Sequence, residues 1–118
     1  MSDVARTQRV GEEFREILAE EIPKLKDPRV GFVTVVSVRV SPDLRHAWVV
    51  YSSMGDEKAK ASTRAALRSA RSHLRNAIGR QVRLRYLPEL EFEEDTTYEE
   101  ARRIDELIAR ARIAEEDR

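Results

Sequence analysis

The sequence predicts an α+β fold in which a small sheet of three strands is backed by helices, in the order α-β-β-α-β-α. Three patterns predict it: apolar residues at helical spacing near both ends and in the middle, two β-branched runs joined by a turn signal, and one strictly alternating segment. The 118 residues contain no internal repeat and no linker. We therefore expect one domain over residues 1–118, with about 1–6 and 114–118 flexible.

The first helix is expected from about Thr7 to the low twenties. Its apolar residues recur every three or four positions, which is typical of an amphipathic helix: they are Val10, Phe14, Ile17, Leu18, Ile22 and Leu25. Pro23 lacks an amide hydrogen and should end or kink this helix. The segment DPRVG that follows is expected to form a turn.

Two extended runs come next, Phe32–Val40 and Leu44–Met54, and both are rich in β-branched residues. The Ser-Pro-Asp between them is a turn signal, so we expect an antiparallel pair. Alternation should place Trp48 and Val50 on one face with Leu44, and Arg45, Ala47 and Val49 on the other.

A second helical region is predicted from Glu57 to about Gly79, because the segment is rich in alanine and Gly79 is a plausible stop. Its expected buried face consists of Ala66, Leu67, Ala70, Leu74, Ala77 and Ile78.

The third strand is predicted over Tyr86–Glu93, where Leu90 and Phe92 alternate with glutamates, and Pro88 should lie at its start or on an edge. Thr97 to Glu100 has the spacing of a capping box, which begins a final helix. The apolar residues of that helix are Ala101, Ile104, Leu107, Ile108 and Ala111.

Charge is strongly segregated although the formal net charge is zero. From Lys58 to Arg85 there are nine lysines and arginines and no acid, whereas from Glu89 to Glu100 there are seven acids and no base. Such asymmetry is typical of a polyanion-binding face, and we expect the acidic segment to face away from the polyanion.

The helical basic residues fall on one side of their helix, at about 100° per residue. This basic ribbon consists of Lys60, Arg64, Arg68, Arg71 and Arg75. Aligned arginines repel one another and match regularly spaced phosphates, so RNA is the leading partner. One alternative is a solvated face bridged to the acidic strand, and another is a protein-interaction adaptor whose ribbon binds an acidic partner.

Signals of catalysis, cofactors and metals are missing. There is no cysteine, no nucleotide-binding glycine motif and no catalytic serine motif, and the only histidines are His46 and His73. A small hydrolase using either histidine is a third, weaker hypothesis. No apolar run is long enough for a membrane span. Trp48 and Tyr51 are candidates for base stacking, but a lone tryptophan in a small domain more often belongs to the core.

Three segments carry a family resemblance: RVGEEFREILAEEI, DPRVGFVTVVSVRVSPDLRHAWVVYSSMG and LRYLPELEFEEDTTYEEARRIDELI. Together they resemble ribosome-binding factor A over nearly the whole chain, about Arg9 to Ile108. The most specific parts are Asp27–Gly31, Ser41–Ala47 and Leu84–Tyr86 with Pro88–Leu90.

The resemblance implies a type II KH-like domain in which a helix-kink-helix replaces the usual G-x-x-G loop. The kink maps to Ala70, Arg71 and Ser72, with serine where the family usually has glycine. The implied role is a non-enzymatic factor that binds the free small ribosomal subunit near its neck and assists late maturation of its rRNA. The resemblance also implies departure before translation, a link to growth in the cold, and assembly GTPases as possible further partners. We also expect a monomer, and the absence of cysteine suits the cytoplasm.

The expected RNA-binding residues combine the charge pattern with the family motifs. They are Lys60, Arg64, Arg68, Arg71, Arg75, Arg80, Arg83, Arg85, Arg29, Arg45 and His46. No catalytic residue, cofactor or metal is expected.

Overall fold

The structure is a computed structural model that describes residues 3–116. It confirms the α+β class and the order of elements, with the second helical region divided in two. The elements are α1 (Asp3–Glu21), the short 3-10 helix η1 (Ile22–Lys24), β1 (Val33–Val40), β2 (His46–Ser53), α2 (Glu57–Ser69), α3 (Arg71–Gln81), β3 (Glu89–Glu94) and α4 (Thr97–Glu116).

The sheet has the order β1-β2-β3, so β2 is central and β3 is an edge strand. β1 and β2 are antiparallel, as the turn signal predicted, with an irregularity between Val35 and Ser37. β2 and β3 are parallel because the chain crosses from one to the other through α2 and α3. This crossover places the basic helices beside the acidic strand.

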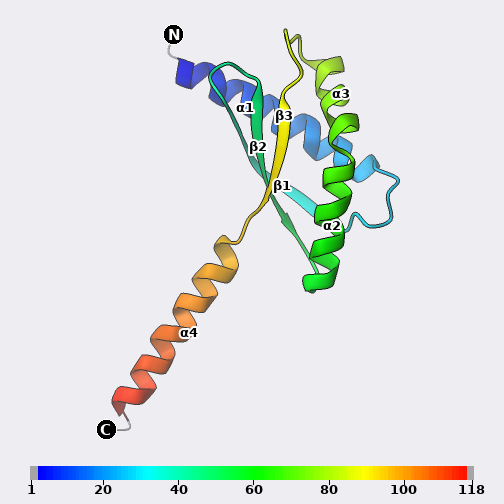
Figure 1. Ribbon diagram of the computed structural model, residues 1–118. Helices are drawn as coiled ribbons and strands as arrows, with labels where there is room; N and C mark the ends of the chain where they lie inside the picture. Colours follow the sequence, from blue (N-terminus) through cyan, green and yellow to red (C-terminus); the bar gives the residue numbers. More distant parts are fainter. Residues whose placement is uncertain (1–2, 117–118) are drawn as a thin grey trace.

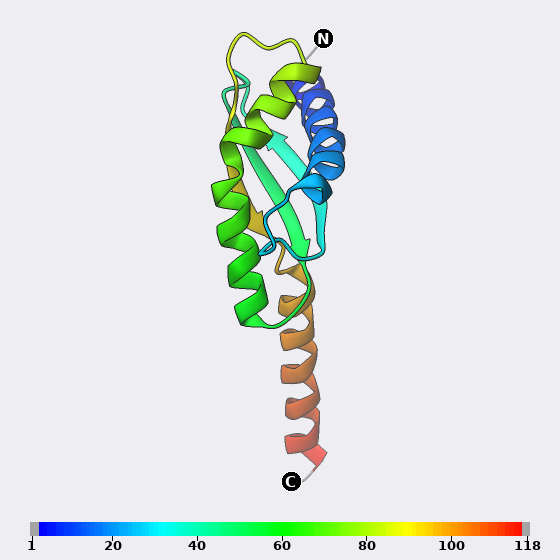
Figure 2. The ribbon, with the colours of Figure 1, turned by 90° about the vertical axis from the view of Figure 1, so that its right-hand side faces the viewer.

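One face of the sheet is covered by α1, α2 and α3, and the other face is open (Figures 1 and 2). Ala47, Val49 and Tyr51 of β2 point into the core and are at most 1% exposed. Trp48 and Val50 lie on the opposite face, as the alternation predicted, and are only partly buried. Trp48 is therefore not a core residue, because the period of two assigns the buried face to its neighbours.

Helix α1 packs against β1 at very short range because of Gly11. A β-carbon at this position would overlap the main-chain carbonyl oxygen of Val38. Phe14 and Leu18 of the same helix are fully buried in the core. The predicted apolar stripe thus forms, and a glycine within it sets the distance between helix and strand.

The helix pair α2–α3 bends at Ala70 (Figure 2), which has φ −87° and ψ 0°. Its amide donates to the carbonyl oxygens of Ala66 and Leu67, at 3.0 and 3.2 Å. These dihedral angles are accessible to alanine, so the break needs no glycine, and Ser72 lies in the first turn of α3. The predicted stop at Gly79 is wrong, because α3 continues to Gln81 and Gly79 lies against Leu87.

The predicted buried face of this helix pair is confirmed for five of its six residues, which are fully buried, while Ala70 at the break is half-buried. They are Ala66, Leu67, Leu74, Ala77 and Ile78.

Helix α4 extends away from the rest of the molecule (Figure 1) and contains no buried residue. Its start differs from the predicted capping box, because Thr97 is already helical and the hydroxyl of Thr96 donates to Glu100 at 2.9 Å. We expected flexible ends at about residues 1–6 and 114–118. Of these, residues 3–6 and 114–116 are helical, and residues 1–2 and 117–118 lie outside the described part. Within the described residues, no helix is both long and apolar enough to cross a membrane.

Candidate nucleic-acid interface

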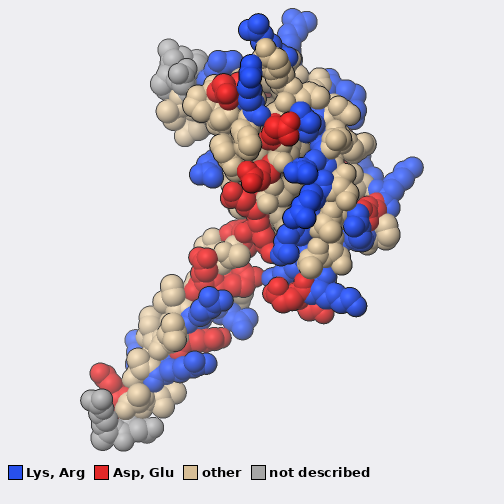
Figure 3. All heavy atoms as spheres, in the orientation of Figure 1, with Lys and Arg blue, Asp and Glu red and all other residues tan. Residues whose placement is uncertain are grey.

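The basic ribbon follows α2 and α3 along the side that faces β3. Figure 3 shows it as a blue band with red carboxylate groups beside it. Arg64, Arg68 and Arg71 line a hollow of about 190 Å³ together with Glu91 and Phe92 of β3. Arg64, Arg68 and Arg71 are exposed, whereas Lys60 and Arg75 are only partly exposed. The ribbon borders directly on the acidic strand.

Two cations near the start of the ribbon are paired with carboxylates. Lys60 Nζ lies 3.0 Å from Glu99 Oε1, and Arg64 Nη2 lies 3.4 Å from Glu94 Oε2. The hydrogen bond between Lys60 and Glu99 raises the pKa of Lys60 and lowers the pKa of Glu99. The expectation that the acidic segment faces away is thus wrong, because the parallel crossover brings it alongside the helices.

Arg75 is held by the segment that leads into β3. Its Nε donates to the carbonyl oxygen of Pro88 at 2.8 Å, and its Nη2 donates to that of Leu87 at 3.3 Å. Nη2 also lies 3.1 Å from Glu89 Oε1. Arg75 therefore connects α3 to β3 and has a structural part in the fold.

Arg68 and Arg71 are the two ribbon residues without a carboxylate partner among residues 4–116, and both are exposed. Arg71 Nε donates to the main-chain carbonyl oxygen of Arg68 at 3.3 Å, across the break at Ala70. This bond uses one donor and leaves the terminal nitrogens of Arg71 available. The free positive charge of the ribbon is thus concentrated at the bend.

A second basic group lies at the opposite end of α3. Arg45, Arg83 and Arg85, all predicted from the sequence, line a hollow of about 310 Å³. Arg6 and Tyr86 also line it, and neither was among the predicted site residues. Arg6 belongs to the first turns of α1, far along the chain from the other arginines, so local sequence gave no sign that it joins them. We name this group the arginine cluster: Arg6, Arg45, Arg83 and Arg85.

The remaining predicted residues line neither hollow. Arg29 forms an ion pair with Asp27 at 2.7 Å and donates to Ser69 next to the bend at 3.3 Å. Arg80 is exposed on α3 and lines neither hollow. His46 lies on the open face of the sheet, 3.3 Å from Glu91.

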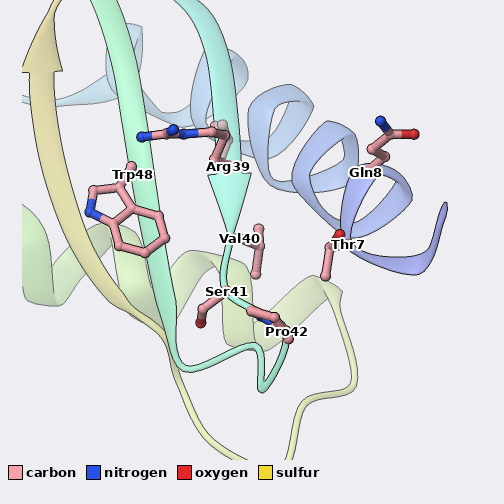
Figure 4. Close-up of a pocket in the computed structure, with 8 residues that line it drawn as sticks. Thr7, Gln8, Arg39, Val40, Ser41, Pro42 and Trp48 are labelled. Atoms are coloured by element: carbon pink, nitrogen blue, oxygen red, sulfur yellow. The ribbon is translucent and has the colours of Figure 1, made fainter. Parts of the chain in front are cut away.

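A groove of about 590 Å³ lies along the edge strand β1, between α1 on the covered face and Trp48 of β2 on the open face (Figure 4). Trp48 and Arg39 lie on it, with the guanidinium carbon of Arg39 5.5 Å from the tryptophan ring centre. The ring of His46 stacks on Trp48 at 4.7 Å. The groove is lined by Thr7, Gln8, Ser41 and neighbouring residues, and this lining includes no carboxylate or histidine. Nothing in the groove therefore suggests acid–base chemistry.

The two histidines have different surroundings. His46 is engaged by Trp48 and Glu91, and exposed His73 has no hydrogen-bond or ion-pair partner among residues 4–116. No group of three or more potential metal ligands occurs among the described residues.

A sheet of this order, covered on one face and flanked by a bent basic helix pair, defines a KH-like α+β domain with a cationic surface. The model of the family Ribosome-binding factor A matches residues 6–108. The chain therefore belongs to the ribosome-binding factor A family.

Similar proteins support this assignment. Ribosome-binding factor A of Acidothermus cellulolyticus is 46% identical over 118 residues, which covers 99% of this chain and 79% of that protein. The crystal structure of ribosome-binding factor A from Thermus thermophilus is 35% identical and superposes with a TM-score of 0.67, covering 75% of this chain and 94% of that one. A homology model of the Thermus thermophilus factor, fitted into a cryo-EM map of a 30S complex, has a TM-score of 0.63 at 35% identity, with the same coverage.

Proposed function

We propose that this protein binds the free small ribosomal subunit through its basic ribbon and assists late maturation of small-subunit rRNA. The observation that carries the proposal is the exposed pair Arg68 and Arg71 at the helix bend, which has no carboxylate partner among residues 4–116. Guanidinium groups bind phosphate oxygens through paired N–H donors, so this pair suits the backbone of folded RNA. The fitted 30S complex of the Thermus thermophilus relative supports the same partner.

The proposed mode of action is binding without catalysis. Double-helical RNA presents mainly phosphates and its shallow groove to a protein, so we expect recognition by shape and charge with little base reading. Further parts of the proposal are action as a monomer in the cytoplasm, release before translation with help from assembly GTPases, and a contribution to growth in the cold.

The carboxylates beside the ribbon refine the proposal. Lys60 and Arg64 are engaged by Glu99 and Glu94 before any RNA arrives. Phosphates that contact these two cations must compete with the carboxylates. We therefore assign the first contact to Arg68 and Arg71, and a weaker one to the paired cations.

The double variant R68E/R71E tests this face. We expect it to lower co-sedimentation with purified small subunits at least about tenfold, because it replaces two attractive contacts with repulsive ones. Arg75 is avoided because it holds the segment before β3. The matched control R110E/R112E makes the same total change in charge, but on α4. It should bind within about twofold of the unchanged protein.

Undiminished binding by R68E/R71E, with an unchanged urea midpoint, would reject the assigned face. Treatment of a cell extract with RNase addresses the adaptor hypothesis. If the protein remains in large complexes after the RNA is digested, its partner is an acidic protein.

A further inference from the structure

We propose that the arginine cluster is a second, preformed binding site for a backbone phosphate of RNA, in which Tyr86 positions the arginines. The proposal rests on the proposed function, because it adds a contact to the same rRNA partner. The site draws on three separate parts of the chain: the start of α1, the turn between β1 and β2, and the segment between α3 and β3.

The four positive charges of the cluster are only partly compensated, by one carboxylate. Among residues 4–116, none of its four guanidinium groups forms an ion pair with a carboxylate. The hollow contains one acid, Asp43, whose carboxylate accepts from the hydroxyl of Ser41 at 2.7 Å and from the amide of Arg45 at 3.1 Å. These bonds lower the pKa of Asp43, so its carboxylate stays ionised and is engaged by groups of its own turn. The net field of the hollow is positive.

Two of the arginines lie over the ring of Tyr86. The guanidinium carbon of Arg45 lies 4.1 Å from the centre of the tyrosine ring, and that of Arg85 lies 5.7 Å from it. A cation–π contact needs no hydrogen-bond acceptor, so N–H groups of both arginines remain free to donate to a ligand. The tyrosine is itself 48% exposed, so a ligand can reach these groups from solvent.

The backbone of Arg45 is fixed on both sides. Its amide donates to Asp43, and its carbonyl oxygen accepts from the amide of Glu89 at 2.8 Å, where β3 begins. The preceding residue, Leu44, is the one non-glycine residue with positive φ (62°) in the described chain. A β-carbon makes this conformation costly, and such strain is often maintained at functional sites. The turn therefore presents Arg45 to the ring in one orientation.

The cluster differs from the ribbon in one respect that bears on ligand size. The ribbon runs along two helices and suits a series of phosphates, whereas the cluster surrounds a single hollow of about 310 Å³. Several arginines around one small space favour one phosphate group with bidentate contacts. The shared chemistry is an oxyanion with several acceptor oxygens, and the proposed source is an internal phosphodiester.

NMR of the arginine Nε–H groups in the full chain tests the site. The probe is pentauridylate with a 5′-hydroxyl end, with inorganic phosphate and the 5′-phosphorylated pentamer as parallel titrations. We expect the signals of Arg45 and Arg85 to shift with all three probes. If internal phosphodiesters are bound, the dissociation constants of the two pentamers should agree within about twofold. Shifts confined to Arg68 and Arg71 would overturn the site, and at least about tenfold tighter binding of the 5′-phosphorylated pentamer would overturn its backbone assignment.

The positioning role of Tyr86 has its own test. The variant Y86F keeps the ring and should bind pentauridylate within about twofold of the unchanged protein, whereas Y86L should weaken binding about fivefold by removing the stacking surface. In an R45A/R85A background, Y86L should have no further effect. R110A/R112A on α4 serves as the control for the two charges lost in R45A/R85A, and urea midpoints verify folding. Equal binding by Y86L and Y86F would overturn the role.

The site and the proposed function can fail separately. Small-subunit binding that is insensitive to R68E/R71E rejects the ribbon, whatever the cluster does. Small-subunit binding that is lost in R68E/R71E but unchanged in both Y86L and R45A/R85A rejects the cluster as an rRNA contact and leaves the proposed function intact.

Discussion

Two glycines within helices show how differently the same residue can be constrained. A β-carbon on Gly11 would overlap a main-chain oxygen of β1, whereas one on Gly79 would meet Cδ2 of Leu87 at 2.5 Å. The main chain of a strand cannot move without disturbing its neighbours, but Leu87 is 37% exposed and its side chain can rotate. The helical pattern alone does not distinguish these positions.

We therefore expect G11A and G79A to have opposite consequences. Alanine favours a helix by about 1 kcal/mol over glycine, but overpacking against a strand costs about 1–3 kcal/mol. G11A should lower the free energy of unfolding by up to about 2 kcal/mol, and G79A should leave it unchanged or raise it slightly. Urea denaturation measures both values. A G11A variant as stable as G79A would show that α1 does not approach β1 this closely.

At the scale of elements, β3 has two roles that its sequence pattern does not separate. Leu90 contributes to the core, while Glu89 and Glu94 pair with the ribbon and Glu91 borders its hollow. The first turn of α4 adds Glu99. The acidic segment is therefore a set of internal counter-charges for the proposed RNA-binding face, and it should limit the affinity of that face for phosphate.

The double variant E94Q/E99Q should consequently bind RNA more tightly. Glutamine keeps the shape of each side chain but frees Arg64 and Lys60 and removes repulsion toward phosphates. We expect about threefold or greater tightening at low salt, and a steeper decline of affinity with salt as two more cations become available. The control E115Q/E116Q removes the same charge from the far end of α4. Equal affinity of the two variants in an RNA-binding titration would show that the ion pairs do not compete with phosphate.

At the scale of the whole molecule, the extended position of α4 dominates the dimensions. The Cα radius of gyration is 18.2 Å, whereas a compact chain of this length has about 13–14 Å. The apolar residues Ile104, Leu107 and Ile108 of α4 are 49–56% exposed. The predicted helix exists, but it does not help to back the sheet.

Small-angle X-ray scattering should reproduce this shape. We expect a radius of gyration near 18 Å for the full chain and about 12–13 Å after deletion of residues 97–118. Because α4 buries no side chain, the deletion should move the thermal midpoint by no more than about 4 °C. A compact full chain, or a truncated protein that unfolds far earlier, would show that α4 packs on the domain in solution.

Local sequence was sufficient for the elements and for the direction of most side chains. Hydrophobic periodicity located the helices and strands, and the spacing of Arg64, Arg68 and Arg71 placed them on one side of their helix, because both follow from the geometry of a single element. The break at Ala70 was expected from the family resemblance and not from propensity, since alanine strongly favours an uninterrupted helix.

Tertiary structure decided which charges meet. The parallel pairing of β2 and β3 set Glu94 beside Arg64, and the packing of α1 brought Arg6 to the hollow around Tyr86. Electrostatic contacts depend on distances in space, and these segments are far apart along the chain. Residue type and spacing therefore defined which groups could bind a polyanion, while the fold determined which of them are free to do so.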